Sequence, residues 1–181
     1  YFQIAGASWV ALLAMRGFSL LEIGMLESIF HIVSCIFEIP SGVAADVFGR
    51  KKTMVMSQLA SLLSSVMMVW SEGFWATAFA IGFSALSYNL ASGTREALAY
   101  DSLKLVGKEN EYNTFAATDM MLYRITNSTS TLCAGLALFL GFRKAYTADI
   151  LFTLIALFIA CSLKEVEIGT KTDEKKYLTE W

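Results

Sequence analysis

The chain of 181 residues has little proline, little histidine and little charge. It contains one proline and one histidine, and only 17% of its residues are Asp, Glu, Lys or Arg. A single histidine excludes a multi-histidine metal site. A formal net charge of −2 leaves no basic excess that could neutralise nucleic-acid phosphates. We therefore expect no metal, no cofactor and no nucleic acid among its partners.

Cysteine pairs and common catalytic motifs are also missing. Cys35, Cys133 and Cys161 each lie in an apolar run, and none belongs to a CxxC pair, so the sequence indicates neither a disulfide framework nor a zinc site. It contains no GxxxxGK[ST], GxSxG or HExxH motif. An enzyme is therefore not expected.

Hydrophobic residues make up 56% of the chain, and the mean hydropathy is +0.54. The chain is far more hydrophobic than a typical soluble domain. Several apolar runs approach the ~20 residues that a helix needs to cross a bilayer. The composition therefore predicts an all-α integral membrane protein in contact with the lipid bilayer.

The apolar runs predict six transmembrane helices in one bundle. The predicted spans are 1–15, 20–43, 53–70, 74–97, 115–140 and 146–163. The first span reads as clipped. We assign 1–163 to an N-terminal six-helix bundle and the polar segment 164–181 to a cytoplasmic linker toward a missing C-terminal half.

The basic residues between the spans predict an orientation, because short cytoplasmic loops are enriched in Lys and Arg. The side of the membrane that holds the "GRKK" loop is predicted to be cytoplasmic. The two ends of the chain are predicted to lie on this side as well. The segment Phe142 to Lys144 opposes this bias. The basic residues on the first side are Arg50, Lys51, Lys52, Lys104, Lys108 and Lys164, and those on the other are Arg16, Arg143 and Lys144.

Charged residues within spans are costly and usually face a bundle interior or a watery cavity. They concentrate in the second, fourth and fifth spans, which we therefore expect to line a cavity. The third and sixth spans are expected to support them, and the serines at 57, 61 and 65 predict a ridge for close helix packing. The charged residues are Glu27, His31 and Glu38, then Arg95, Glu96 and Asp101, then Asp119 and Arg124.

Five of these residues are candidates for a substrate or proton path. Glu27 and His31 share a helix face at i, i+4 spacing. A rise of ~1.5 Å per residue puts His31 and Arg124 near the middle of a ~30 Å hydrocarbon core, where transporters bind substrates and ions. Arg95 and Asp119 complete the set. His31 as a packing residue, and Glu27 in a structural pair, remain open alternatives.

The stretch "GVAADVFGRKKTM", residues 42–54, resembles the loop 2-3 signature of the major facilitator superfamily, G-x-L-A-D-R-x-G-R-K-x-x-L. It departs from that pattern at Ala44, Val47 and Met54. "EIPSG" before it and "SGTREALAYDSL" after the fourth span resemble a bacterial subgroup without assigned substrates. The matching residues are Gly42, Ala45, Asp46, Gly49, Arg50 and Lys51.

This resemblance implies half of a twelve-helix fold, with the six helices as 3+3 inverted repeats. "FGRKKT" after the second span and "GFRKAYT" before the sixth read as a trace of that symmetry. The resemblance implies secondary active transport of a small-molecule substrate by alternating access in a bacterial plasma (inner) membrane. Proton coupling through Glu27, His31 or Asp119, and efflux, are open options. The alternative is a transport-inactive sensor or assembly partner of the same fold.

The resemblance also implies that the signature forms a gate. Gly42 and Gly49 are expected to let the backbone turn and approach closely. Arg50 is expected to bridge Asp46 to an acid at the end of the fourth span, for which we select Asp101. Together with Lys51, these residues would lock the protein in its outward-facing state.

Overall fold

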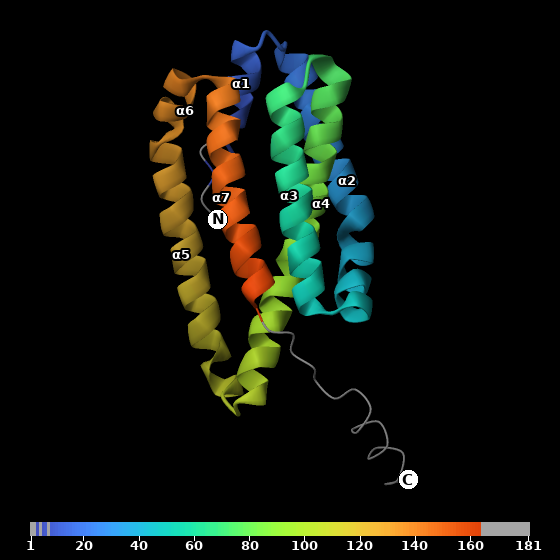
Figure 1. The fold of residues 1–181 in the computed structure, drawn as a ribbon, viewed down its shortest axis with the longest axis vertical. Helices are drawn as coiled ribbons and strands as arrows, with labels where there is room; N and C mark the ends of the chain where they lie inside the picture. Colours follow the sequence, from blue (N-terminus) through green and yellow to red (C-terminus); the bar gives the residue numbers. More distant parts are fainter. Residues whose placement is uncertain (1–2, 4, 7, 164–181) are drawn as a thin grey trace.

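The computed structural model describes residues 3, 5, 6 and 8–163, and these residues form helices and turns without a strand (Figure 1). One short 3-10 helix, η1, precedes α5. The helices are α1 (Trp9–Met15), α2 (Leu20–Phe48), α3 (Arg50–Trp70), α4 (Gly73–Leu105), η1 (Glu109–Glu111), α5 (Tyr112–Leu132), α6 (Ala134–Leu140) and α7 (Phe142–Ser162).

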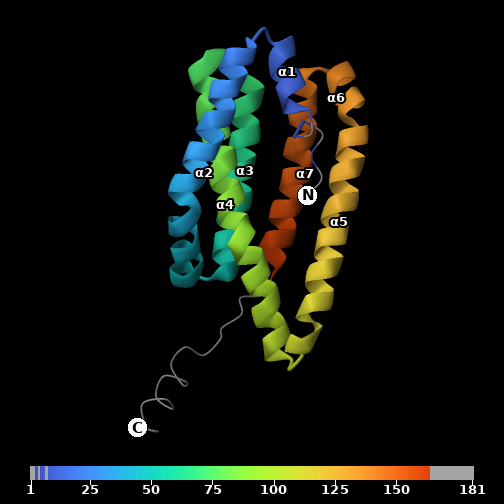
Figure 2. The same ribbon diagram turned by 180° about the vertical axis from the view of Figure 1, so that it is seen from behind.

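The long helices run up and down in one bundle. α3 packs against α4 and α7, and α2 packs against α4, whereas α5 lies at the edge. α3 and α7 form the face seen in Figure 1, and α2, α4 and α5 lie toward the viewer in Figure 2. We name the two ends of the bundle by their arginines. The Arg16 end holds the α1–α2, α3–α4 and α6–α7 turns, and the Arg50 end holds the α2–α3 turn and the α4–α5 connection.

Helix α2 begins where the sequence predicts and ends later. Ser19 and Glu22 form a capping box, in which each side chain accepts from the backbone of the other residue, and this fixes the helix start. Pro40 lies inside α2, and the prediction of an end near Val43 is wrong because the helix continues to Phe48. The Ser41 hydroxyl donates to the Glu38 carbonyl at 2.8 Å. Prolines are tolerated within membrane helices.

Small polar side chains join α3 to α4 in the core. The Ser57 hydroxyl donates to the Ser87 carbonyl at 3.0 Å, and the Ser64 hydroxyl donates to the Ala80 carbonyl at 2.8 Å. The predicted packing ridge is confirmed at Ser57 and Ser65, both of which are buried. Small residues bring helix backbones close together, so direct hydrogen bonds between the two helices become possible.

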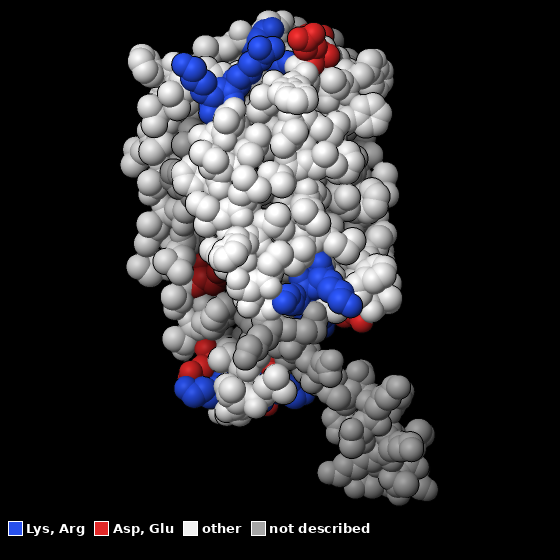
Figure 3. All heavy atoms as spheres, in the orientation of Figure 1, with Lys and Arg blue, Asp and Glu red and all other residues white. Residues whose placement is uncertain are grey.

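The face formed by α3 and α7 fits contact with lipid. Figure 3 shows its Lys and Arg side chains gathered at the two ends, with a band between them that carries almost no charge. Three helices in the described part of the chain are long and apolar enough to cross a membrane, namely α2, α3 and α7. Two of these three form the uncharged face.

The prediction of six spans is therefore corrected to three by length and composition. α4 and α5 are long enough but too polar, which is the composition expected of helices that line a cavity. The predicted span 115–140 divides at Cys133 into α5 and α6.

The boundaries of the remaining predicted elements also shift. α1 has 7 residues and ends at Met15, as predicted, but begins at Trp9 instead of position 1. α4 continues eight residues past the predicted end at Ala97, to Leu105, and α7 begins at Phe142 instead of Tyr146. The predicted linker 164–181 lies outside the described residues.

Candidate gate and polar path

Arg50 joins two helices at the Arg50 end of the bundle. It is the first residue of α3, and its Nη2 atom lies 3.3 Å from Oδ1 of Asp46 in the last turn of α2. Its Nε atom lies 3.4 Å from Oδ2 of Asp101 on α4. The Asp101 side chain is 15% exposed and that of Asp46 is 68% exposed, so the contact with Asp101 is the better shielded from solvent.

Gly49 alone separates α2 from α3, and its backbone explains why a glycine is needed. Its φ of 96° and ψ of 151° fall in a region that is essentially restricted to glycine. Thr53 is fully buried one turn later, and its hydroxyl donates to the Gly49 carbonyl at 3.0 Å and to the Ala44 carbonyl at 3.3 Å. This tight turn points Arg50 toward α4.

Gly42 and Lys51 are the other two signature residues of the predicted gate. A Cβ added at Gly42 would meet no atom within 4 Å, so the close backbone approach expected there is absent among the described residues. Gly42 is exposed on α2. Lys51 follows Arg50 in the first turn of α3 and is partly buried.

The path residues form two pairs. His31 Nε2 lies 3.2 Å from Glu27 Oε1 along α2, and His31 is exposed. Arg95 on α4 lies 3.9 Å from Asp119 on α5, and both side chains are partly buried. Arg124 is exposed on α5, and within residues 8–163 it forms no ion pair with the other four.

An open groove of about 480 Å³ between α2 and α4 has an apolar wall. Val33 faces Gly82 across it, and a Cβ added at Gly82 would come within 4.0 Å of Val33. None of the residues that line the groove is charged, so it offers apolar contacts. The lining residues are Ile29, Val33, Phe37, Trp75, Ala78, Phe79, Gly82, Phe83 and Leu86.

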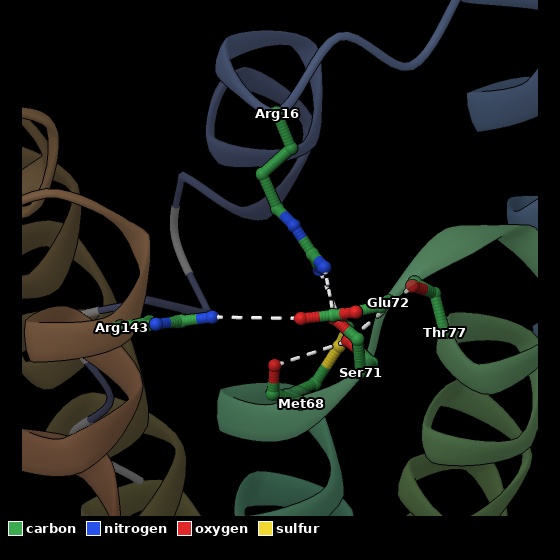
Figure 4. A network of polar contacts seen from close by, with 6 residues as sticks. All are labelled: Arg16, Met68, Ser71, Glu72, Thr77 and Arg143. Atoms are coloured by element: carbon green, nitrogen blue, oxygen red, sulfur yellow. Dashed lines mark hydrogen bonds and ion pairs between the residues drawn. The ribbon is translucent and has the colours of Figure 1, made fainter.

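A second arginine network lies at the Arg16 end, and sequence reasoning missed it. Arg16 donates from Nη1 to the Ser71 hydroxyl at 3.0 Å and from Nη2 to the Ser71 carbonyl (Figure 4). Its guanidinium lies 4.0 Å from the ring centroid of Phe142. Arg143 lies 3.9 Å from Glu72 beside it. Desolvation lowers the pKa of Arg16 below its ordinary value, and the nearby charge of Arg143 adds to this shift.

Asp149 on α7 is a buried acid that the sequence prediction placed in a supporting helix. Its side chain is 2% exposed and accepts a hydrogen bond from the Ala5 backbone nitrogen at 3.1 Å. An aspartate inside the predicted span 146–163, near its beginning, was the available signal for such a contact. Asp149 therefore fastens the segment before α1 to α7.

The described residues contain no group of three or more His, Cys, Asp or Glu side chains that could hold a metal ion. The arrangement comprises ion pairs at the helix ends, polar pairs on α2, α4 and α5, and an apolar groove. These features define a polytopic helical membrane protein.

The chain belongs to the Major Facilitator Superfamily, whose family model matches residues 2–179. It is 32% identical over 88 residues to a protein of Bacillus subtilis (strain 168) described as the uncharacterized MFS-type transporter YxaM. This match covers 49% of the chain and 22% of the relative. No solved structure matches the chain. The resemblance found in the loop 2-3 signature is thereby confirmed.

Proposed function

We propose that this chain forms the N-terminal half of a secondary active transporter, which moves a small solute through a bacterial plasma membrane by alternating access. Membership of the superfamily points to membrane transport in general. The observation that carries the finer proposal is the double contact of Arg50 with Asp46 and Asp101.

Arg50 acts in this proposal as a lock at the cytoplasmic side. It ties the α2–α3 turn to the end of α4, a helix whose polar residues suit a cavity wall. If α4 moves away from that turn to open the cavity inward, the Arg50–Asp101 contact must break. A partly buried ion pair resists such separation more strongly than a surface pair. The closed lock therefore favours the outward-facing state.

A repeated local structure supports two inverted repeats. Gly141 separates α6 from α7 as Gly49 separates α2 from α3, and its φ of 81° and ψ of 164° resemble those of Gly49. α3 and α7 each have 21 residues, run in opposite directions and pack side by side (Figure 1). Opposite direction is the relation expected for helices exchanged by an axis in the membrane plane.

The polar pairs supply the path in this proposal. Glu27 and His31 on α2, together with Asp119 beside Arg95, are the groups that would carry protons, because carboxylates and histidine can exchange them in a membrane protein. Arg124 and Arg95 would bind an anionic part of the solute. The apolar wall between α2 and α4 would hold its apolar part.

The exposure of α5 supports the proposal that a C-terminal half of the transporter packs against this chain. Of the 21 residues of α5, only Ser130 is buried, although the helix is long and lies at the edge of the bundle. A helix in a membrane with polar residues on its surface needs a protein neighbour or a watery cavity. We propose that α5 packs against a C-terminal half, and that both ends of this chain lie in the cytoplasm.

Flux through the full-length protein in proteoliposomes tests the function. A panel of labelled sugars, amino acids and lipophilic cations is offered under gradients of either direction, which also decides between uptake and efflux. Asp101→Asn should lower the flux by about tenfold, because it removes the shielded partner of Arg50. Glu96→Gln removes an exposed acid from the same helix and serves as the matched control.

Wild-type flux in the Asp101→Asn protein would contradict the gate. The absence of flux for every solute would favour a transport-inactive sensor. Imposing a pH gradient on the same vesicles tests whether solute flux is coupled to protons. An equal flux with and without the gradient would contradict proton coupling.

A further inference from the structure

We propose that the contacts of Arg16 are the counterpart, at the opposite end of the bundle, of the contact between Arg50 and Asp101, and that Arg16 clamps α1 to the start of α7 and to the α3–α4 turn. The contacts of Arg16 are observed in the structure, whereas a part for this clamp in transport rests on the proposed function. Arg16 lies in none of the predicted gating or path sets.

The two contacts occupy corresponding places if the helices form inverted repeats, although the arginine stands on the opposite partner in each. Arg50 and Phe142 are each the first residue of a helix, and each follows a glycine with positive φ. Asp101 and Arg16 lie at or near the C-terminal ends of α4 and α1, which are the first helices of the two repeats. The Arg50–Asp101 contact at one end thus corresponds to the Phe142–Arg16 contact at the other.

The chemistry of the two contacts differs. At the Arg50 end the cation meets a carboxylate, whereas at the Arg16 end the cation meets an aromatic face at 4.0 Å. A guanidinium on an aromatic face is attracted by the ring quadrupole and stacks well because it is planar. Because the ring of Phe142 is uncharged, this contact at the Arg16 end involves no carboxylate.

Arg16 also reaches a third element. It donates to both the hydroxyl and the carbonyl of Ser71, and the Ser71 hydroxyl donates to the Met68 carbonyl at 3.1 Å (Figure 4). Thr77 donates to the same hydroxyl at 3.4 Å. One side chain therefore holds the C-terminal end of α1, the α3–α4 turn and the start of α7 together.

The clamp has a consequence for α1. This helix has 7 residues, of which Leu12 and Leu13 are buried in the core, and Arg16 adds the polar contacts at its C-terminal end. A short helix is held by its contacts more than by its own hydrogen bonds. We infer that the end of α1 moves with α7 as one body, which is what a rocking half requires.

Hydrogen exchange of the full-length protein in detergent micelles tests the clamp without a substrate. Arg16→Gln should speed amide exchange in residues 12–18 and in 71–74 by about tenfold, while the middle of α3, residues 57–65, remains protected. Phe142→Leu should act on 12–18 in the same direction. Arg16→Lys keeps the charge without the planar guanidinium and should give an intermediate rate.

Lys144→Gln is the matched control, because it removes an exposed positive charge near the same end. Unchanged exchange in both Arg16→Gln and Phe142→Leu would overturn the clamp. Equal acceleration in Lys144→Gln would also overturn it, since loss of charge would then be the cause. Acceleration across 57–65 as well would show general destabilisation and count against a local clamp. A wild-type protein that carries no solute would refute the proposed function and leave these results valid.

Discussion

The two ends of the bundle are built alike but held differently. Each has a helix pair separated by one glycine, with basic residues in the first turn of the second helix. At the Arg50 end, the arginine binds two carboxylates. At the Arg16 end, the arginine binds a ring, a hydroxyl and a carbonyl. The backbone frame therefore does not determine the chemistry of the contact.

This difference suits the two sets of contacts to different roles within this half. An ion pair between carboxylate and guanidinium depends on charge and salt. A contact with a ring and backbone depends mainly on local geometry. We therefore expect the Arg50 contacts to break and form during the transport cycle, and the Arg16 contacts to maintain the shape of this half throughout it.

The largest effect is expected from the two connecting glycines. Replacing Gly49 or Gly141 with alanine forces a Cβ into a backbone region that costs about 1–3 kcal/mol. Both variants should lower the free energy of unfolding by that amount, as measured by thermal unfolding in detergent. Gly93→Ala is the control, because Gly93 is helical and a Cβ there meets no atom within 4 Å. An equal loss in the control would refute the argument.

An intermediate effect separates the two kinds of contact. A double-mutant cycle should give a coupling of about 1 kcal/mol for Arg16 and Phe142, and this should persist in 1 M salt. The cycle for Arg50 and Asp46 should give about 0.3–0.5 kcal/mol at low salt and almost none in 1 M salt, because Asp46 is exposed. Similar salt dependence for both pairs would remove the distinction.

The smallest effect is expected at the exposed pair of the Arg16 end. Arg143 and Glu72 lie 3.9 Å apart, and their side chains are 74% and 87% exposed. Exposed pairs contribute little, so Arg143→Gln should change the free energy of unfolding by less than about 0.5 kcal/mol. Chemical denaturation of the variant beside Arg16→Gln measures this, and a larger loss for Arg143→Gln would reverse the roles of the two arginines.

The sequence predicted the Arg50 end better than the Arg16 end for a physical reason. Asp46, Gly49 and Arg50 lie within five positions of one another, so a local motif records their geometry. Asp101 could be selected because an acid at the end of a predicted span has few alternatives. Both contacts of Arg50 are present in the structure, whereas the gating role remains a proposal.

The Arg16 contacts could not be predicted in this way. Ser71 is 55 positions from Arg16, and a ring such as that of Phe142 carries no charge that would mark it as a partner. Apolar composition also fails to show where a helix divides, so the break at Cys133 was missed. Apolar composition likewise did not show that α2 continues past Val43 to Phe48.

Reciprocal thiol labelling tests the central claim most directly. In the full-length protein without its native cysteines, single reporters Val10→Cys near the Arg16 end and Ser92→Cys on α4 are exposed positions. Asp101→Asn should speed labelling at Ser92→Cys and slow it at Val10→Cys, because a weakened lock shifts the population toward the inward-facing state. Faster labelling at both positions, or no change at either, would contradict alternating access through the Arg50 lock.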